Sequence, residues 1–319
     1  MSASPEPIRI GISSCLLGEH VRFDGGHKRD AFLVDTFGPF VEWVPVCPEV
    51  ELGLGTPRES LRLIRRADEI RMVNTKSGRD ISAEMRTWAA RRADQLAGER
   101  LCGYIFKKDS PSCGMERVKV YGEAGVGERN GRGLFAAALM ERFPRLPCEE
   151  EGRLTDPRLR DNFIERVFAW ARLRSLFAAR WTVGELVRFH TAHKMALLAH
   201  STEIYNQMGR LVAGAKAMPR AEVETSYRAL FMDGLARMAT PRKHANVLMH
   251  MAGHFKKLLD ADEKQELLSS IADYQTGLVP LIVPLTLLKH HVRRHKVEYL
   301  AGQVYLDPHP KELMLRNHV

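Results

Sequence analysis

The sequence lacks a hydrophobic run long enough to cross a membrane. A transmembrane helix needs about 18 or more consecutive apolar residues, and the longest apolar candidate, residues 277–288, is interrupted by Pro280 and Pro284. The opening residues, MSASPEPIRIG, also lack the basic and then apolar layout of a secretion signal. These absences predict a cytoplasmic protein with no membrane partner, and nothing in the sequence indicates an obligate protein partner.

Cysteine is scarce, and its five residues all lie in the first half of the chain. An odd number without an export signal argues against a disulfide framework and for free thiols or metal ligands. Cys102 and Cys148 are most simply explained by packing or surface exposure. The other three, Cys15, Cys47 and Cys113, are too far apart for a compact zinc ribbon or a ferredoxin motif.

Several other signals are missing. No GxGxxG follows the first expected strand, which argues against flavin or radical chemistry, and no HExxH-type spacing indicates a histidine-based metal site. Internal repeats and low-complexity linkers are absent too. With 319 residues, of which 45% are hydrophobic, the chain is an ordinary globular protein that is long enough for two domains.

What is present in the first half is an alternation of apolar runs and amphipathic stretches, typical of an α/β, Rossmann-like domain with a largely parallel sheet. From residue 155 onward the pattern becomes helix after helix, with N-cap residues Asp156, Thr182, Ser201 and Thr240. We therefore predict an α/β domain over residues 1–165 and an all-α domain over residues 166–319. The strands expected in the first domain are 8–13, 42–46, 103–106 and 117–121, and the helices are 28–37, 82–97 and 133–142.

Cys15, Cys47 and Cys113 each follow one of the first three expected strands. Ligands bind outside the carboxyl ends of the strands in such sheets, so we expect the three thiols to reach one crevice. From the residues alone they could hold zinc or an iron–sulfur cluster, include one catalytic nucleophile, or be unrelated.

The residues beside these cysteines leave alternatives open as well. Glu49, in CPE, could be a general base or an acid at a helix N-terminus. Ser110 and Ser112, in SPSCG, could be turn formers or proton relays.

Charge is strongly segregated along the chain. Acidic and basic residues balance over residues 1–165, so the net charge of +9 belongs entirely to the remainder, which also holds every histidine except His20 and His27. This segregation predicts a polyanionic partner for the helical domain. The candidate contacts are Arg188, His190, His193, Lys194, Arg242, Lys243, His244, Lys289, His290, Arg293, Arg294, His295 and Lys296.

Three segments carry a resemblance to a known family. IGISSCLLGEHVRFDGGHKRD, VCPEVELGLGTPRE and CGYIFKKDSPSCG resemble, in this order, the signature segments of the thiouracil desulfurase family. The helical part, with LVRFHTAHKMALLAHS and TPRKHANVLMHMAGHFKK, resembles an uncharacterised domain found fused to the first. The fused arrangement is similar to bacterial desulfidases that act on 4-thiouridine in tRNA.

The resemblance implies a 4Fe-4S cluster bound by Cys15, Cys47 and Cys113, with the fourth iron free to bind the thiocarbonyl sulfur of the substrate. It implies catalytic roles for Glu49 and for Ser110 or Ser112. Ser14, Asp24 and Lys108 lie in the same segments and are expected to contact the substrate.

The expected reaction converts 4-thiouridine in tRNA to uridine. Soft sulfur suits iron better than the hard oxygen of uracil does, and a water activated by Glu49 would replace the sulfur, which leaves as sulfide. No electron is consumed, so the reaction is a hydrolysis. Alternatives are a desulfidase for free thiouracil or thiolated nucleosides and nucleotides, and a non-catalytic metal-containing sensor that binds nucleic acid.

Overall fold

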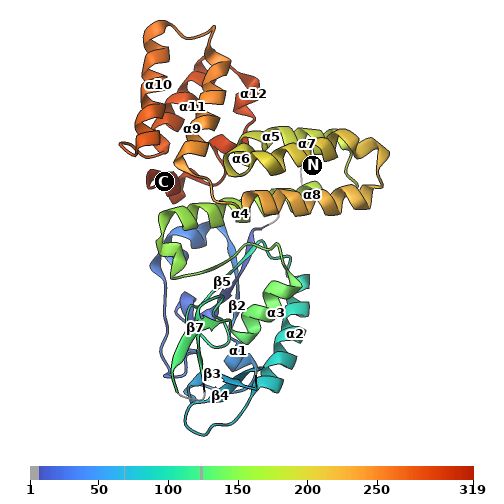
Figure 1. Cartoon of the computed structure of the whole chain (residues 1–319), viewed down its shortest axis with the longest axis vertical. Helices are drawn as coiled ribbons and strands as arrows, with labels where there is room; N and C mark the ends of the chain where they lie inside the picture. Colours follow the sequence, from blue (N-terminus) through green and yellow to red (C-terminus); the bar gives the residue numbers. More distant parts are fainter. Residues whose placement is uncertain (1–6, 68, 123–124) are drawn as a thin grey trace. The chain divides into compact units, whose positions relative to one another are not determined.

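The computed structural model of the chain describes residues 7–319 apart from positions 68, 123 and 124. The chain folds into two compact units, residues 1–155 and 156–319. The first is α/β and the second is helical, which confirms the expected fold classes (Figure 1). The boundary lies just before α4 (Pro157–Leu176), whereas the expected boundary after Glu165 falls inside this continuous helix.

The first sheet of the α/β unit is parallel. Its strand order is β2-β1-β5-β8, and every neighbouring pair is parallel. β1, β2 and β5 match three expected strands, whereas the fourth, β8, begins at Cys148 and was not among the expected strands. The strands are β1 (Arg9–Ser13), β2 (Glu42–Val46), β5 (Gly103–Phe106) and β8 (Cys148–Glu150).

Two long helices, α2 (Ser82–Gly98) and α3 (Leu134–Arg142), pack on each other and on this sheet. The ring of Phe135 lies 5.4 Å from that of Trp88 on α2 and 5.8 Å from that of Tyr104 on β5. These aromatic contacts bury one face of the sheet. The unit's shorter helical segments are η1 (Ser14–Leu17), η2 (Phe32–Phe37), η3 (Gly38–Phe40), α1 (Pro48–Glu51) and η4 (Arg153–Thr155).

The helix expected over residues 28–37 is shorter than predicted. Only the π-helical turn η2 and residue 31 before it are helical in this segment. The residues before it are not helical because their amides bond to η1, the turn that follows β1. The Lys28 amide donates to the Cys15 carbonyl, and the Asp30 amide donates to the Leu16 carbonyl.

A second sheet was not expected. Its order is β4-β3-β6-β7, with β3 antiparallel to β4, parallel to β6, and β6 antiparallel to β7. The strand expected at 117–121 is β6, and it belongs to this second sheet rather than to the parallel one. The strands are β3 (Leu61–Arg66), β4 (Glu69–Asn74), β6 (Val118–Tyr121) and β7 (Gly127–Gly131).

The helical unit begins with the predicted caps. Asp156 accepts hydrogen bonds from the amides of Arg158 and Leu159, and Thr182 forms a reciprocal capping box with Glu185. The longer helices are α4, α5 (Val183–Ala192), α6 (Lys194–His200), α7 (Thr202–Gly214), α8 (Arg220–Leu235), α9 (Pro241–Ala252), α10 (Ala261–Thr276) and α11 (Ile282–Arg294). The shorter ones are η5 (Ala215–Ala217), η6 (Gly253–Phe255), α12 (Glu298–Ala301), η7 (Val304–Leu306), η8 (Lys311–Leu313) and η9 (Leu315–Asn317).

These helices enclose two hydrophobic cores. One is formed by residues of α4 to α8 and the other mainly by residues of α9 to α12 with α6. None of the helices that the structure describes is both long and apolar enough to span a membrane.

Candidate active site

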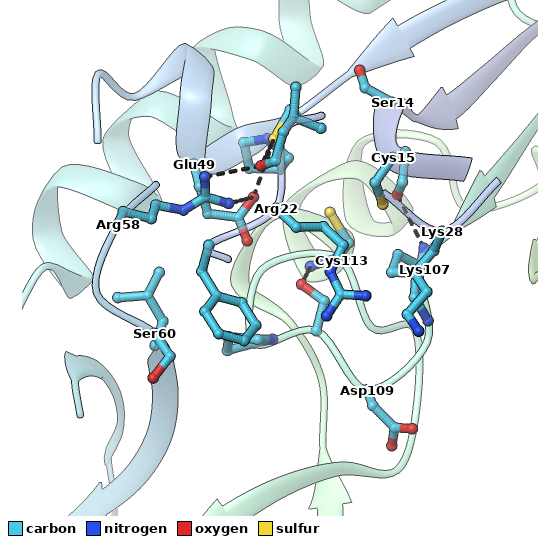
Figure 2. A pocket seen from close by; sticks show the side chains of 18 of the residues that line it. Ser14, Cys15, Arg22, Lys28, Glu49, Arg58, Ser60, Lys107, Asp109 and Cys113 are labelled. Atoms are coloured by element: carbon cyan, nitrogen blue, oxygen red, sulfur yellow. Dashed lines mark hydrogen bonds and ion pairs between the residues drawn. The ribbon is translucent and has the colours of Figure 1, made fainter. Parts of the chain in front are cut away.

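The three cysteines that were singled out line one cavity of the α/β unit, with a volume of about 440 Å³. Cys15 lies in η1 directly after β1, Cys47 directly follows β2, and Cys113 ends the loop after β5. Because β2, β1 and β5 are adjacent parallel strands, their carboxyl ends meet at one edge of the sheet. Figure 2 shows Cys15 and Cys113 facing the same hollow. The expected placement of the three thiols is confirmed, and their role as ligands remains a prediction.

The loop that carries Cys113 is fixed by the start of α3. The first amides of a helix have no partner within the helix, and here the amide of Leu134 donates to the Pro111 carbonyl while those of Phe135 and Ala136 donate to the Ser112 carbonyl. Ser112 and Cys113 are therefore held by the backbone of a helix rather than by a flexible loop.

Gly133 is required for this approach. A Cβ atom at this position would lie 2.4 Å from the Ser112 carbonyl oxygen and 2.8 Å from the Cys113 amide nitrogen. The start of α3 at Gly133 thus serves as the surface against which the cysteine loop packs.

Glu49 lies at the centre of the polar contacts in the cavity. It is 9% exposed, in the first turn of α1, and its Oε1 accepts a hydrogen bond of 2.5 Å from the Ser112 hydroxyl. Its Oε2 accepts from the Cys47 thiol at 3.6 Å and lies 3.8 Å from the Arg58 guanidinium. The guanidinium is itself fixed, since it donates to the Val21 and Gly55 carbonyls at 2.9 Å.

The two serines form a directed chain. A carboxylate only accepts hydrogen bonds, so the single hydroxyl proton of Ser112 points to Glu49. The Ser110 oxygen lies 3.0 Å from the Ser112 oxygen, and Ser110 must therefore be the donor to Ser112. Ser110 lines the cavity, whereas Ser112 is fully buried behind it. The chain Ser110 to Ser112 to Glu49 can carry a proton between the cavity and the carboxylate.

Glu51, the neighbouring carboxylate, has a structural role. Its Oε1 accepts from the Cys47 amide at 3.3 Å, and its Oε2 pairs with Arg92 at 2.9 Å. Of the two acids of α1, only Glu49 lines the cavity.

Burial dominates the electrostatics of the thiols. It raises the pKa of Cys15 to about 11, against the lowering effect of the Lys107 ammonium. Burial and then the Glu49 carboxylate raise the pKa of Cys47 to about 12, and the same two causes raise the pKa of Cys113 well above its usual range. A nucleophilic cysteine needs a lowered pKa, so the three thiols do not suit that role. Metal binding would release their protons.

The donor set fits an iron–sulfur cluster better than a single ion. Among the residues that the structure describes, no three His, Cys, Asp or Glu side chains converge closely enough to hold one metal ion. A cluster spreads its thiolate ligands over different irons, and three soft thiols around a cavity of this size match that requirement.

The predicted substrate contacts are only partly brought together. Ser14 and Lys108 line the cavity, but Asp24 does not. Asp24 lies in an exposed turn, where it accepts from the Gly26 amide at 3.0 Å and pairs with Arg22 at 3.4 Å. These contacts draw its carboxylate into the turn.

Other residues at the cavity were missed in the sequence. Arg58, in the segment TPRE, and Lys107, the first lysine of KKDSPSC, both line it. Lys107 is anchored by Glu151 at 2.5 Å. Lys107 directly follows a predicted strand, which was a usable signal, whereas the contact of Arg58 with Glu49 depends on the tertiary fold.

The expected basic contacts of the helical unit differ in exposure. His190, His193 and His244 were expected to contact a partner at the surface, but they are buried, so this expectation was wrong for these three residues. Lys243 donates to the His200 carbonyl, while Lys289 pairs with Asp307 and Arg294 with Glu263. Of these candidates, the ones that are exposed and form no ion pair in the described part of the chain are Arg188, Arg242, His290, Arg293 and Lys296, whereas Lys194 and His295 are half-buried.

Comparison with known proteins gives matches for both units. The family model described as 2-thiouracil desulfurase matches residues 10–151, and the model described as protein of unknown function DUF1722 matches residues 194–310. The uncharacterized protein YbgA of Escherichia coli K12 is 34% identical over 161 residues, which cover 50% of this chain and 95% of that protein. The uncharacterized protein YbbK of Bacillus subtilis 168 is 30% identical over 151 residues, 44% of this chain and 96% of its own length.

Among solved structures, a 4Fe-4S-dependent thiouracil desulfidase, TudS, is similar to this chain. The two share 30% sequence identity at a TM-score of 0.39, and the match covers 46% of this chain and 93% of TudS.

Proposed function

Because the chain belongs to the 2-thiouracil desulfurase family through residues 10–151, we propose that it is an iron–sulfur-dependent desulfidase that hydrolyses 4-thiouridine in tRNA to uridine. Desulfuration of a thiouracil-like base is the activity that the family carries. The choice of 4-thiouridine in tRNA as the substrate goes beyond the family and rests on the basic helical unit.

Cys15, Cys47 and Cys113 are the residues that would hold the cluster. When bound, the cluster supplies a soft Lewis acid that prefers thiocarbonyl sulfur to carbonyl oxygen. Ser14 and Lys108, together with the Lys107 ammonium, are available at the cavity wall to orient the pyrimidine ring.

Glu49 is the proposed general base. Its Oε2, which lies 3.6 Å from the Cys47 sulfur, takes a proton from water. The water oxygen bonds to the ring carbon as the carbon–sulfur bond breaks and sulfide leaves. Arg58 holds the carboxylate in place from the other side. Once Glu49 is protonated, rotation of its carboxyl group and of the two serine hydroxyls reverses the direction of donation, so that the Ser110–Ser112 chain returns the proton to the cavity. Substrate and water give uridine and sulfide without net electron transfer.

The single observation that carries the catalytic proposal is the buried hydrogen bond between Ser112 and Glu49, a residue that lines the cavity together with the three cysteines. A carboxylate needed only for helix capping would not require this relay to a second loop, 63 residues away along the chain. A non-catalytic sensor would not need it either.

The tRNA substrate is supported by charge. The net charge of +9 lies outside residues 1–165, and Arg188, Arg242, Arg293 and Lys296 are exposed on the helical unit. Phosphates dominate nucleic-acid affinity, and A-form RNA is recognised largely through shape and backbone. Free thiouracil offers no phosphate to such a surface.

The test uses protein purified without air and two substrates, thiolated tRNA and free 4-thiouracil. We expect loss of 4-thiouridine from the tRNA, measured by nucleoside analysis after digestion, at a rate that falls as salt is raised. Unchanged 4-thiouridine in the presence of an intact cluster would refute the tRNA substrate. Salt-independent conversion of the free base alone would favour the alternative of a desulfidase for small thiolated compounds.

A further inference from the structure

The second sheet forms a groove beside the cysteine cavity. Its volume is about 480 Å³, and three residues, Leu61, Asp109 and Pro111, line both hollows. Pro111 directly precedes Ser112 and Cys113, while Figure 2 shows Asp109 at an edge of the cavity away from Glu49. A chain-like ligand with one unit in the cavity could therefore continue into the groove.

Three cations lie side by side along this groove. Lys119 on β6 pairs in register with Arg129 on β7. On the other side of β6, Leu63 of the parallel strand β3 pairs with Val120, so Arg62 and Lys119, each one residue earlier, lie opposite each other. Paired residues of adjacent strands point to the same face. Arg62, Lys119 and Arg129 thus form a cross-strand row, and all three are exposed and line the groove.

This row is poorly neutralised. Arg129 pairs with Asp109 at 2.7 Å, but in the described part of the chain no carboxylate pairs with Arg62 or Lys119. Like charges directly opposite each other on neighbouring strands destabilise a sheet. Because this row of like charges destabilises the sheet when no ligand is bound, it indicates an anionic ligand. The α/β unit as a whole is close to neutral, so the positive charge is local to the groove.

An aromatic ring completes the groove. Tyr121, two residues after Lys119, is half-buried in the groove lining, and the Arg62 guanidinium lies 5.7 Å from the centre of its ring. Cations that follow a phosphate backbone, combined with an aromatic face on which a base can stack, are the features of single-strand nucleic-acid binding.

We propose that this groove binds single-stranded RNA next to the thiolated nucleotide: Arg62, Lys119 and Arg129 contact phosphates, and Tyr121 stacks with a neighbouring base. The proposal deepens the proposed function, on which it rests, by giving the catalytic unit its own RNA contact in addition to the helical unit. It also requires that the thiolated nucleotide be presented in an unpaired stretch.

The test measures binding of a short, labelled, single-stranded RNA containing one 4-thiouridine to the full-length protein by fluorescence anisotropy. Each phosphate contact on a single strand releases about 0.7 counterion. The double variant Arg62→Ala/Lys119→Ala should therefore reduce the slope of log Kd against log salt by about 1.4 and raise Kd about 25-fold at about 0.1 M salt. Tyr121→Ala should weaken binding without changing the salt slope.

Arg91→Ala is the matched control, because Arg91 is an exposed arginine on α2 that lines neither hollow. Its Kd and salt slope should equal those of the wild type. Wild-type affinity in the double variant, or an equal loss in Arg91→Ala, would overturn the proposal.

Turnover separates this proposal from the proposed function. The double variant should desulfurate the nucleoside 4-thiouridine as the wild type does, while its kcat/KM for the short RNA falls. If the wild type binds the RNA through the groove but leaves its 4-thiouridine intact, the proposed function is contradicted and the RNA-binding role of the groove is supported. If nucleoside turnover falls equally, the variant has damaged the cavity and the groove proposal is contradicted.

Discussion

Glu49 is the residue on which the proposed chemistry depends. As a general base it should contribute about 10²- to 10⁴-fold to the rate. Glu49→Ala should therefore lower kcat by about that factor and leave the iron content per chain unchanged, because the carboxylate is not one of the expected ligands. Iron analysis and single-turnover kinetics on the same preparation measure both quantities.

Glu51→Gln is the control for this variant. Glu51 lies on the same turn but does not line the cavity, and its carboxylate contacts the Cys47 amide and Arg92 instead. It should keep activity within a few-fold of the wild type. Full activity in Glu49→Ala would show that another group activates the water.

Replacing Ser110 or Ser112 should lower kcat to different extents. Ser112 donates directly to Glu49, whereas Ser110 reaches the carboxylate only through Ser112. Ser112→Ala should reduce kcat more than Ser110→Ala does, and the double variant should resemble Ser112→Ala alone because both residues act through one chain. Additive losses would contradict the relay.

At the scale of elements, the contact between the α3 start and the cysteine loop should control cluster binding. In Gly133→Ala, the new methyl group would meet the backbone of Ser112 and Cys113, so the loop must shift. We expect a lower iron content and a lower rate, with the helical unit unaffected. Gly98→Ala, at the end of α2 where a Cβ meets nothing within 4 Å, should bind as much iron as the wild type; equal iron content in both variants would argue against the contact.

A buried ion pair joins α4, α6 and η9 in the helical unit. The Glu165 carboxylate lies 3.5 Å from the His200 ring and 4.0 Å from Arg316. Burial alone would raise the pKa of Glu165, but His200 and Arg316 lower it below its usual range, and Glu165 raises the pKa of His200 against the effect of burial. Both groups are charged when the pair is intact.

The pH dependence of stability follows from these directions. The contribution of Glu165 to the free energy of unfolding is fully present above its unfolded pKa of about 4.3 and is lost as the pH falls through its lowered folded pKa. The contribution of His200 is fully present below about 6.5 and is lost as the pH rises through its raised folded pKa. The melting temperature of the helical unit, followed by far-ultraviolet circular dichroism, should therefore decline above about pH 6.5.

His200→Gln should remove this alkaline decline, whereas His250→Gln, at an exposed position of α9, should preserve it. An unchanged alkaline slope in His200→Gln would mean that the pair does not stabilise the fold.

At the scale of the whole molecule, the segregated charge predicts how tRNA is bound. Arg293 and Lys296 are exposed at the end of α11. Arg293→Ala/Lys296→Ala should weaken tRNA binding and lower the salt slope by about 2, since each lost phosphate contact lowers it by about 1. Turnover of the free nucleoside should stay constant. Lys289→Ala should have a smaller effect because Asp307 already holds this ammonium, and equal effects would contradict the assignment.

The sequence was sufficient for three of the four strands of the parallel sheet and for the convergence of the cysteines, because buried strands and their following loops have clear local signals. β3 and β4 were missed since their arginines, among them Arg62 and Arg71, obscure the alternation of apolar residues. The pairing of Ser112 with Glu49 depends on tertiary contacts that no local pattern reveals. Likewise, His190 and His193 lie in a basic segment, and only the packing of the helices shows that they are buried.

The most direct test of hydrolytic desulfuration is to incubate anaerobically prepared protein with 4-thiouridine-containing tRNA in water carrying the heavy oxygen isotope. The nucleosides are then analysed by mass spectrometry and the sulfide is quantified. We expect uridine that has gained one heavy oxygen for every sulfide released, and loss of both products in Glu49→Ala with its cluster intact. Unchanged 4-thiouridine beside an intact cluster, or uridine without the heavy oxygen, would contradict hydrolytic desulfuration.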